Sequence, residues 1–345
     1  RRRLLRKAAK QSADAGDAST AASETTATAA LDSSALFVSG KLVDVVSRGI
    51  AEHWIVPPSD LEFLSVKAMS GGFGDVRKAR LMKSADVAIK ICKDLDGPGG
   101  ASASAAIALK NEIRIFRRVR HANIVLFYGV TVVQGGALGL VLEWVAGGDF
   151  HAFVAKRRKL GDYLTDLGAC RLAGIPLPEW KLLQDVARGL ALLHSQTPPI
   201  LHRDLKPQNV LVEDTRPPKA KLTDFGLSIL MPEGREVHAR AGTRCYMAPE
   251  VMSRRVYGIA ADVYSLGCVM VFATSGCSPP VGGAMGVAKE LEAAAEEDFA
   301  ASAAFAVLAV DCLQVDPGSR PLVSDAVTRL GDIAISAQIL GRSSS

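Results

Sequence analysis

The pattern of apolar and polar residues predicts several helices in this chain. Apolar residues recur with helical spacing in segments 104–120 and 178–196, which predicts one amphipathic helix in each. Segments 264–273 and 303–312 are mostly apolar but too short to cross a membrane, so we expect buried core helices there. The apolar face of the first helix holds Leu109, Ile113, Phe116 and Val119, and that of the second holds Leu182, Leu183, Val186, Leu190 and Leu193.

Two other segments predict strands. Residues 87–90 are rich in β-branched side chains and end in a lysine, and residues 138–144 form a continuous, largely apolar run. Between the first strand and the first helix, residues 94–106 contain Gly97-Pro98-Gly99-Gly100, which predicts a flexible loop.

The remaining segments predict little regular structure. Residues 11–40 are rich in Ala, Ser and Thr with few aromatics, which is typical of a disordered linker. Residues 42–50 predict a short helix. Residues 156–177 carry Gly, Pro and a basic run, and we expect an inserted surface loop there.

Two short motifs carry the candidate chemistry. Residues 202–209 read His-Arg-Asp-Leu-Lys-Pro-Gln-Asn, and an Asp-Phe-Gly motif begins at Asp224, 20 residues after Asp204. Asp204 can accept a proton from a substrate hydroxyl, and Lys206 can neutralise charge on a moving phosphoryl group. Asn209 and Asp224 offer the oxygen ligands that Mg²⁺ prefers. The order and spacing of the motifs therefore predict phosphoryl transfer from ATP.

These motifs resemble those of the eukaryotic protein kinase family, over about residues 61–335. The resemblance implies an α+β, bilobal fold with a small β-rich N-lobe carrying one helix and a larger, mainly α-helical C-lobe. The expected divisions are a basic tail and disordered linker over 1–60, the N-lobe over 61–142, a hinge over 143–146, the C-lobe over 147–335 and a C-terminal tail over 336–345.

A segment ahead of the first predicted strand resembles the family's glycine-rich loop, whose backbone approaches the ATP phosphates closely. Its phenylalanine would shield the phosphates from water. The family usually has glycine where this chain has Met69, and this departure predicts weaker nucleotide binding. The matched residues are Met69, Gly71, Gly72, Phe73, Gly74 and, just after them, Val76.

The resemblance implies the other nucleotide contacts residue by residue. Lys90 is expected to bind the α- and β-phosphates and to pair with Glu112 in the active arrangement. Asp149 is expected to reach the ribose, with a helix N-cap as an equal alternative. Leu142 falls at the gatekeeper position. The expected hinge and adenine contacts are Glu143, Val145, Ala88, Val76 and Leu211.

Further matches are expected to support the site. Glu250 should pair with Arg320 as a structural contact, and Asp262 should brace the backbone of the catalytic loop, residues 202–209. The hydrophobic stack of active kinases matches Phe116, Phe127, His202 and Phe225.

The acceptor specificity is predicted from two residues. Lys206 lies two residues after Asp204, as in serine/threonine kinases, and Thr243 matches a threonine that contacts both of them. Segments 54–57, 222–228 and 242–247 are most similar to the tyrosine-kinase-like branch, which includes the Raf and mixed-lineage kinases and mostly acts on Ser and Thr.

The resulting prediction is a serine/threonine protein kinase that uses ATP and Mg²⁺ and phosphorylates protein Ser/Thr hydroxyls. The main alternative is a pseudokinase, a nucleotide-binding scaffold, for which Met69 is the only sequence support. A small-molecule phosphotransferase on the same fold is weaker, because segment 243–250 resembles a platform for peptide substrates.

Regulation is predicted from the activation segment, the loop that follows Asp224 and ends at Ala248-Pro249-Glu250. Arg203 is of the kind that pairs with a phosphate on this segment. Residues 227–241 nevertheless contain only Ser228 as a hydroxyl, and Thr243 is expected to be occupied structurally. We therefore predict that switching does not use a phosphosite in mid-segment, with Glu233 or Glu236 as alternative partners of Arg203.

Charge and cysteine content bound the partners and the compartment. The net charge of +5 comes from six basic residues among the first ten, and the rest of the chain has 35 basic and 36 acidic residues, which argues against nucleic acid as a partner. The six cysteines are scattered, as in reduced cytoplasmic proteins. The basic residues at the start of the sequence are expected to be either the cytoplasmic flank of a membrane helix upstream of Arg1 or a solvated basic tail, and the tail is at least as strongly expected. Membrane association would come only through sequence upstream of Arg1.

Overall fold

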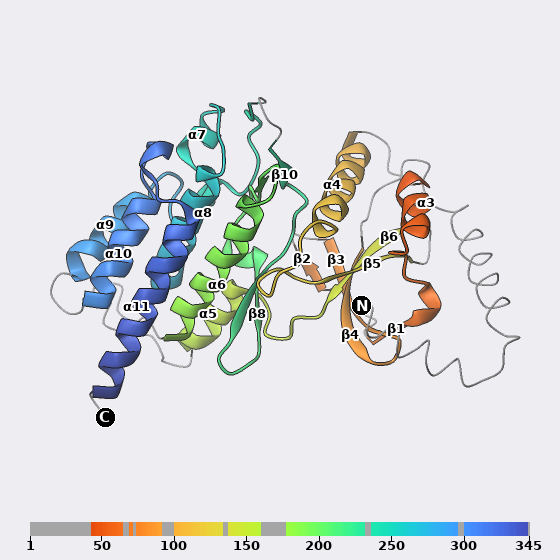
Figure 1. Cartoon of the computed structure of the whole chain (residues 1–345), viewed down its shortest axis with the longest axis horizontal. Coiled ribbons are helices and arrows are strands. Elements are labelled where there is room, and N and C mark those ends of the chain that lie inside the picture. Colours follow the sequence, from red (N-terminus) through yellow and green to blue (C-terminus); the bar gives the residue numbers. More distant parts are fainter. Residues whose placement is uncertain are drawn as a thin grey trace, which may run out of the picture. The chain divides into compact units, whose positions relative to one another are not determined.

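The structure is a computed structural model that describes residues 43–64, 69–71, 74–91, 100–133, 137–159, 177–231, 236–295 and 300–343 (Figure 1). The chain divides into two compact units. The first comprises the residues up to Ala106 together with Tyr128–Leu142, and the second comprises Ile107–Phe127 together with the residues from Glu143 onward. The predicted linker, most of the predicted insertion and residues 94–99 of the predicted loop fall outside the described residues.

A six-stranded sheet forms the first unit, in the order β1-β3-β4-β6-β5, with β2 paired to β3 (Figure 1). β3 pairs in antiparallel fashion with β1, β2 and β4. The strands are β1 (Leu61–Phe63), β2 (Met69–Gly71), β3 (Gly74–Leu81), β4 (Ala85–Ile91), β5 (Phe127–Val132) and β6 (Leu138–Glu143). The predicted strand 87–90 is confirmed as part of β4, and the one predicted over 138–144 is confirmed as β6, which ends one residue earlier.

The two faces of β4 have different roles. Val87, Ile89 and Ile91 alternate with less buried residues and join the apolar core of this unit. Ala88 and Lys90 therefore point to the opposite face, because side chains alternate along a strand. Val76 lies opposite Lys90 in the β3–β4 register, which puts its side chain on the same face.

An N-terminal helix precedes the sheet. α3 (Val43–Ala51) confirms the helix predicted over 42–50, and it buries Val45 and Val46. The chain then runs beside the edge strand β5. The backbone N–H of Val56 donates to the carbonyl of Val130 (2.8 Å), and the N–H of Val130 donates to the carbonyl of Trp54 (3.0 Å). These bonds satisfy edge groups that would otherwise be exposed.

α4 (Gly100–Phe116) begins earlier and ends earlier than predicted. Residues 100–106, expected to belong to a loop, are helical, because the strong helix preference of the alanines outweighs the glycine and proline signal that precedes them. At the other end, residues 117–120 leave the helix in a turn.

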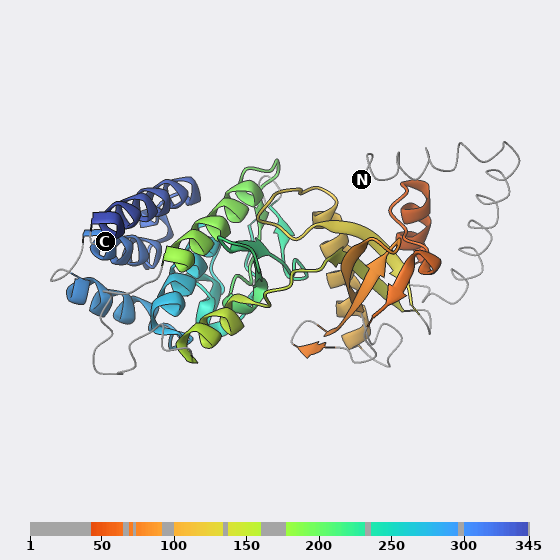
Figure 2. The same cartoon turned by 90° about the horizontal axis from the view of Figure 1, so that it is seen from below.

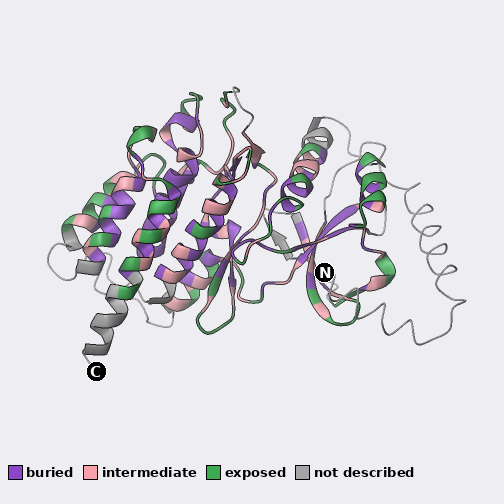
Figure 3. Cartoon of the chain, in the orientation of Figure 1, coloured by how far each residue is buried: buried purple, intermediate pink, exposed green. Residues whose placement is uncertain are grey.

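Helices dominate the second unit. α8, which spans the predicted core helix, is buried along almost its whole length (Figure 3). α11 packs along α6, and α10 packs against α8, α9 and α11 (Figure 2). The helices are α5 (Phe150–Lys159), α6 (Leu177–His194), α7 (Pro249–Met252), α8 (Ala260–Ser275), α9 (Ala284–Ala295), α10 (Ala300–Cys312) and α11 (Val323–Ser343). The helices predicted over 178–196, 264–273 and 303–312 are confirmed in α6, α8 and α10.

Two short sheets complete the second unit. β7 (Ile200–Leu201) pairs with β10 (Ile229–Leu230), and β8 (Val210–Glu213) pairs with β9 (Lys219–Leu222), both antiparallel. The predicted α+β class, with one small β-rich unit and one larger, mainly helical unit, is confirmed. Among the helices in the described part of the chain, none is both long enough and apolar enough to span a membrane.

Candidate active site

The loop that carries Asp204 lies between β7 and β8, and hydrogen bonds to α8 hold its backbone in place. Asp262 in the first turn of α8 is 1% exposed, and it accepts hydrogen bonds from the backbone N–H groups of His202 (2.8 Å) and Arg203 (2.9 Å). Its Oδ2 also lies 2.9 Å from Nε2 of His194. Burial alone would raise the pKa of Asp262, but the contacts with His194, the nearby His202 and the Arg203 backbone lower it. Asp262 therefore stays ionised, and the predicted brace is confirmed.

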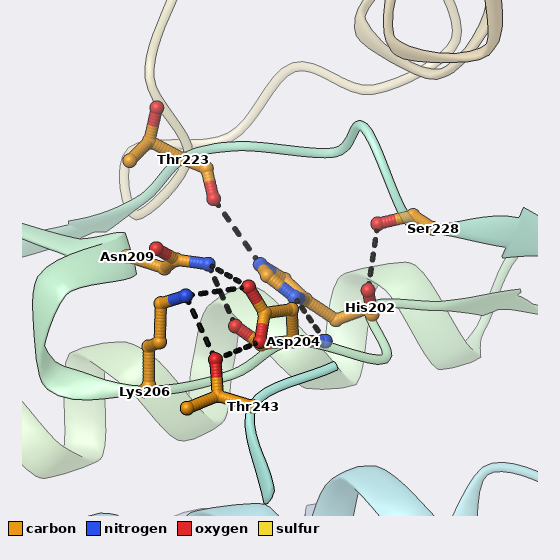
Figure 4. A network of polar contacts seen from close by, with 7 residues as sticks. All are labelled: His202, Asp204, Lys206, Asn209, Thr223, Ser228 and Thr243. Atoms are coloured by element: carbon orange, nitrogen blue, oxygen red, sulfur yellow. Dashed lines mark hydrogen bonds and ion pairs between the residues drawn. The ribbon is translucent and has the colours of Figure 1, made fainter. Parts of the chain in front are cut away.

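Three polar side chains converge on the Asp204 carboxylate (Figure 4). Oγ1 of Thr243 donates to Oδ1 (2.7 Å), and Nζ of Lys206 donates to Oδ2 (2.8 Å). Lys206 also donates to Oγ1 of Thr243 (2.9 Å), which closes a triangle. The predicted contact of Thr243 with both residues is confirmed. Asp204 is held in one orientation with 7% of its surface exposed.

Asn209 is fully buried, and its two amide atoms are in different situations. Its Nδ2 donates to the backbone carbonyl of Asp204 (2.7 Å) and lies 3.2 Å from Oδ2 of the same residue. Its Oδ1 is buried and has no hydrogen-bond partner among the described residues. A buried polar atom without a partner is costly, so this oxygen marks a position for a ligand.

The Asp-Phe-Gly motif begins beside Asn209. Val210 and Leu222 are paired in the β8–β9 register, and the N–H of Thr223 donates to the carbonyl of Asn209 (3.0 Å). Asp224 follows with φ of 62°, a left-handed conformation that aspartate tolerates better than most residues. The hairpin thus brings Asn209 and Asp224 to adjacent strand ends.

Four rings support this turn. Phe225 is fully buried and meets Phe116 edge-on, with centroids 4.9 Å apart, while the ring of His202 lies 5.3 Å from it. Phe116 stacks on Phe127 at 5.6 Å. The predicted hydrophobic stack is confirmed, and aromatic contacts of this kind fix the motif against the catalytic loop.

Gly242 positions Thr243 over the catalytic loop. It has φ of 111°, and a Cβ at this position would lie 2.3 Å from the carbonyl oxygen of Arg203. A side chain would therefore push residues 242–243 away from the loop and separate Thr243 from Asp204.

We expect Gly242→Ala to lower kcat roughly tenfold, since strain and displacement of this kind cost on the order of 1–3 kcal/mol. Gly282→Ala is the matched control, because Gly282 also has a positive φ (72°) but has open space around its Cβ position. Steady-state kinetics on both variants is the measurement. Equal kcat values for the two would contradict the positioning role.

A buried ion pair fixes the chain after the activation segment. Nη1 and Nη2 of Arg320 lie 2.7 and 2.8 Å from the two carboxylate oxygens of Glu250. Arg320 also donates to the carbonyls of Gln314 and Ala260, and its guanidinium lies 5.1 Å from the ring centroid of Tyr264. The predicted structural pair is confirmed.

The residues predicted to hold the nucleotide are distributed over both units. In the first unit, Val76, Ala88 and Lys90 share one face of the sheet, and Gly71 pairs with Gly74 at the β2–β3 turn. Gly72 and Phe73 lie outside the described residues. Lys90 belongs to the first unit and the buried Glu112 to the second, so their pairing stays a prediction.

In the second unit, the segment after the predicted hinge runs beside β8. Asp149 forms an isolated bridge with Leu211, and its Oδ1 accepts from the N–H of Ala152 (2.7 Å) at the start of α5. The N-cap alternative for Asp149 is therefore confirmed, and its ribose contact stays a prediction. The roles of Leu142, Glu143 and Val145 toward adenine likewise stay predictions.

Three residues that contact the site were missed by sequence reasoning. His194 pairs with Asp262, Asn111 donates to the backbone beyond Asp224, and Lys221 lies 2.5 Å from Glu143 in an ion pair. Their partners are distant in sequence. Each stands next to a residue or segment that the sequence analysis singles out, but none of the three belongs to a motif that indicates its contact.

Comparison with known proteins agrees with this geometry. Residues 67–329 match the family model described as the protein kinase domain. The chain therefore belongs to the protein kinase family, and its relatives are consistent with the tyrosine-kinase-like branch.

Three relatives illustrate the range of the match. The chain is 30% identical over 282 residues to the dual specificity protein kinase splA of Dictyostelium discoideum, covering 76% of this chain and 11% of that protein. It is 29% identical over 292 residues to the serine/threonine-protein kinase VIK of Arabidopsis thaliana (81% and 62%). It is 30% identical over 291 residues to the serine/threonine/tyrosine-protein kinase HT1 of the same plant (82% and 69%). The chain thus spans less than two thirds of splA and of VIK.

Proposed function

We propose that this chain is an active serine/threonine protein kinase that transfers the γ-phosphoryl group of ATP to Ser or Thr hydroxyls of protein substrates. The observation that carries the proposal is the network in which Lys206, Thr243 and Asn209 orient the Asp204 carboxylate. Such pre-set polar groups are the main source of catalysis in phosphoryl transfer, because little covalent chemistry falls to the protein.

The residues present fit a magnesium site. Oδ1 of Asn209, which has no hydrogen-bond partner among the described residues, is a hard oxygen ligand next to Asp204. Asp224 lies just after the end of β9, the strand that pairs with β8. Asn209 and Asp224 would hold Mg²⁺, which supplies neutralisation of the phosphate charge when bound. The two bonds that Nδ2 of Asn209 makes leave Oδ1 as the amide atom that would bind the metal.

In the proposed reaction, Asp204 accepts the proton of the substrate hydroxyl as the hydroxyl oxygen attacks the γ-phosphorus. The bond between that phosphorus and the oxygen bridging to the β-phosphate breaks, and ADP leaves with the electron pair. Lys206 offsets negative charge on the transferred group, and Thr243 holds Lys206 and Asp204 in register.

The choice of Ser/Thr acceptors rests on the same two residues. Lys206 and Thr243 both contact Asp204, and this pairing is what the resemblance associates with serine/threonine kinases. The printed names of the relatives include serine/threonine, dual-specificity and serine/threonine/tyrosine kinases, so the acceptor class is part of our proposal.

We assign nucleotide binding to the remaining predicted residues. Lys90 and the glycine-rich loop bind the phosphates, Glu112 pairs with Lys90, and the hinge over 143–146 binds adenine. We propose that the kinase domain spans residues 61–335, which include the matched segment 67–329. We place the reaction in the cytoplasm, and the substrates are proteins.

Phosphate transfer to a generic basic protein tests the proposal. We expect the wild-type chain to transfer label from [γ-³²P]ATP in the presence of Mg²⁺, and Lys90→Met to lose transfer to the background level, because Lys90 would position the phosphates. Lys219→Met is the control, since Lys219 is an exposed lysine on β9 away from the network. Nucleotide binding without transfer by the wild-type chain would instead support the pseudokinase alternative.

A further inference from the structure

Ser228 is buried and uses all of its polar groups. Its backbone N–H donates to the carbonyl of Phe225 (3.1 Å), and its Oγ donates to the carbonyl of His202 (2.9 Å, Figure 4). Its own carbonyl accepts a hydrogen bond from Nδ2 of Asn111, which also donates to the carbonyl of Phe225 (3.3 Å). Ser228 has no exposed surface.

These bonds connect a helix to the catalytic loop. Asn111 lies on α4 one residue before Glu112, and His202 lies two residues before Asp204. A continuous path of hydrogen bonds therefore runs from the Asn111 amide through Ser228 to the His202 carbonyl. β10 begins at the next residue, Ile229, and its pairing with β7 holds the segment in the same place.

Both hydroxyl groups between residues 227 and 243 are already hydrogen-bonded. Between residues 227 and 243 the only hydroxyls are those of Ser228 and Thr243, and Thr243 is bonded to Asp204 and Lys206. Phosphorylation of either one would break a bond that the proposed site needs. Thus neither hydroxyl serves as an acceptor in this arrangement.

The arginine that would pair with a phosphate on the activation segment lines a small cavity. Arg203 lines a cavity of about 10 Å³ with Tyr257 and Asp262, and its Nε is buried with no hydrogen-bond partner in the described part of the chain. A cavity of that size holds about one water molecule. Tyr257 occupies the position beside the segment, donating from its hydroxyl to the carbonyl of Ala239 (2.7 Å). Of the predicted acidic partners, Glu236 lies against His238, and Glu233 is outside the described residues.

We propose that Asn111 and Ser228 are positioning residues that fix the catalytic loop from α4, so that the proposed kinase reaches its active arrangement without a phosphate on the activation segment. This inference rests on the proposed kinase activity and specifies how it is controlled. In a phosphate-dependent kinase, new arginine contacts order the segment. Here neutral, buried hydrogen bonds hold Ser228, at the start of the segment, without a phosphate.

Alanine variants test the positioning role. We expect Asn111→Ala and Ser228→Ala each to lower kcat about tenfold, the effect of losing roughly 1.4 kcal/mol of positioning. The KM for ATP should stay within about twofold. The double variant should cost less than the sum of the single variants, because the two residues belong to one path. Hydrogen exchange at residues 202–204 should accelerate in all three.

The control is Gln184→Ala. Gln184 also uses a side-chain amide to donate to a carbonyl distant in sequence, that of Val327 (3.2 Å), but this bond joins α6 to α11 away from the site. We expect kcat and exchange at residues 202–204 to be unchanged in this variant. Equal losses of kcat in Gln184→Ala and Asn111→Ala would overturn the positioning role.

Phosphatase treatment tests whether the kinase reaches its active arrangement without a phosphate on the activation segment. We expect the wild-type chain, shown by intact mass to carry no phosphate, to retain its full kcat. Loss of activity on dephosphorylation, with recovery on rephosphorylation of a residue in 227–243, would overturn the inference while leaving the kinase activity established. A wild-type chain that transfers no phosphate before or after treatment would instead overturn the proposed function.

Discussion

Replacing Asp204 with asparagine is expected to lower kcat by about 10²–10⁴-fold, the range that a general base contributes, while ATP affinity stays nearly unchanged. Asparagine has the same shape but cannot accept the proton of the substrate hydroxyl. Its amide would also direct N–H groups at Lys206 or Thr243, two groups that now donate to the carboxylate. The ATP phosphates are assigned to other residues, so nucleotide binding should survive.

Single-turnover kinetics and nucleotide titration on the same preparation separate these effects. Asp214→Asn is the control, because Asp214 is exposed after β8 and outside the network. It should leave both quantities unchanged. Parallel loss of ATP binding and turnover in Asp204→Asn would contradict the assignment, since it would mean that Asp204 supports the site's structure and not the proton transfer.

The second large effect is on stability. Arg320→Met is expected to lower the free energy of unfolding by about 3–5 kcal/mol, because it leaves the Glu250 carboxylate buried without its partner. The substitution also leaves the carbonyls of Gln314 and Ala260 without the donor that they now have. Lysine at the same position keeps the charge but loses the two-pronged geometry, so Arg320→Lys should recover only part of the loss.

Urea denaturation measures this difference directly. Arg329→Met is the control, because Arg329 pairs with Asp311 at 2.7 Å but both side chains are more than a third exposed. An exposed pair of this kind contributes about 0–1 kcal/mol. Similar losses for Arg320→Met and Arg329→Met would refute the claim that burial makes the Glu250 pair structural.

The network around Asp204 could be predicted from sequence because its parts lie in short motifs. Asp204, Lys206 and Asn209 fall within six residues, and the resemblance added Thr243, Asp262 and the Glu250–Arg320 pair by position. The structure confirms these contacts. The helical periodicity that predicted α6 and α8 also located the elements that hold the loop.

Contacts that depend on folding geometry alone could not be predicted. Asn111 and Ser228 are 117 residues apart, and an asparagine on a helix or a serine after a strand carries no signal of its own. The start of α4 differs from the prediction because the glycines and proline before it favour a loop, whereas the alanines that follow favour a helix. The sequence permits two roles for Asp149, because both need a carboxylate at that position, and only the hydrogen bond from Ala152 identifies the cap.

Phosphoamino acid analysis after reaction with Mg²⁺ and [γ-³²P]ATP tests the central claim most directly. The account predicts phosphoserine and phosphothreonine in a protein substrate treated with the wild-type chain, and none with Asp204→Asn. Label confined to phosphotyrosine, or nucleotide bound by the wild-type chain with no label transferred, would contradict it.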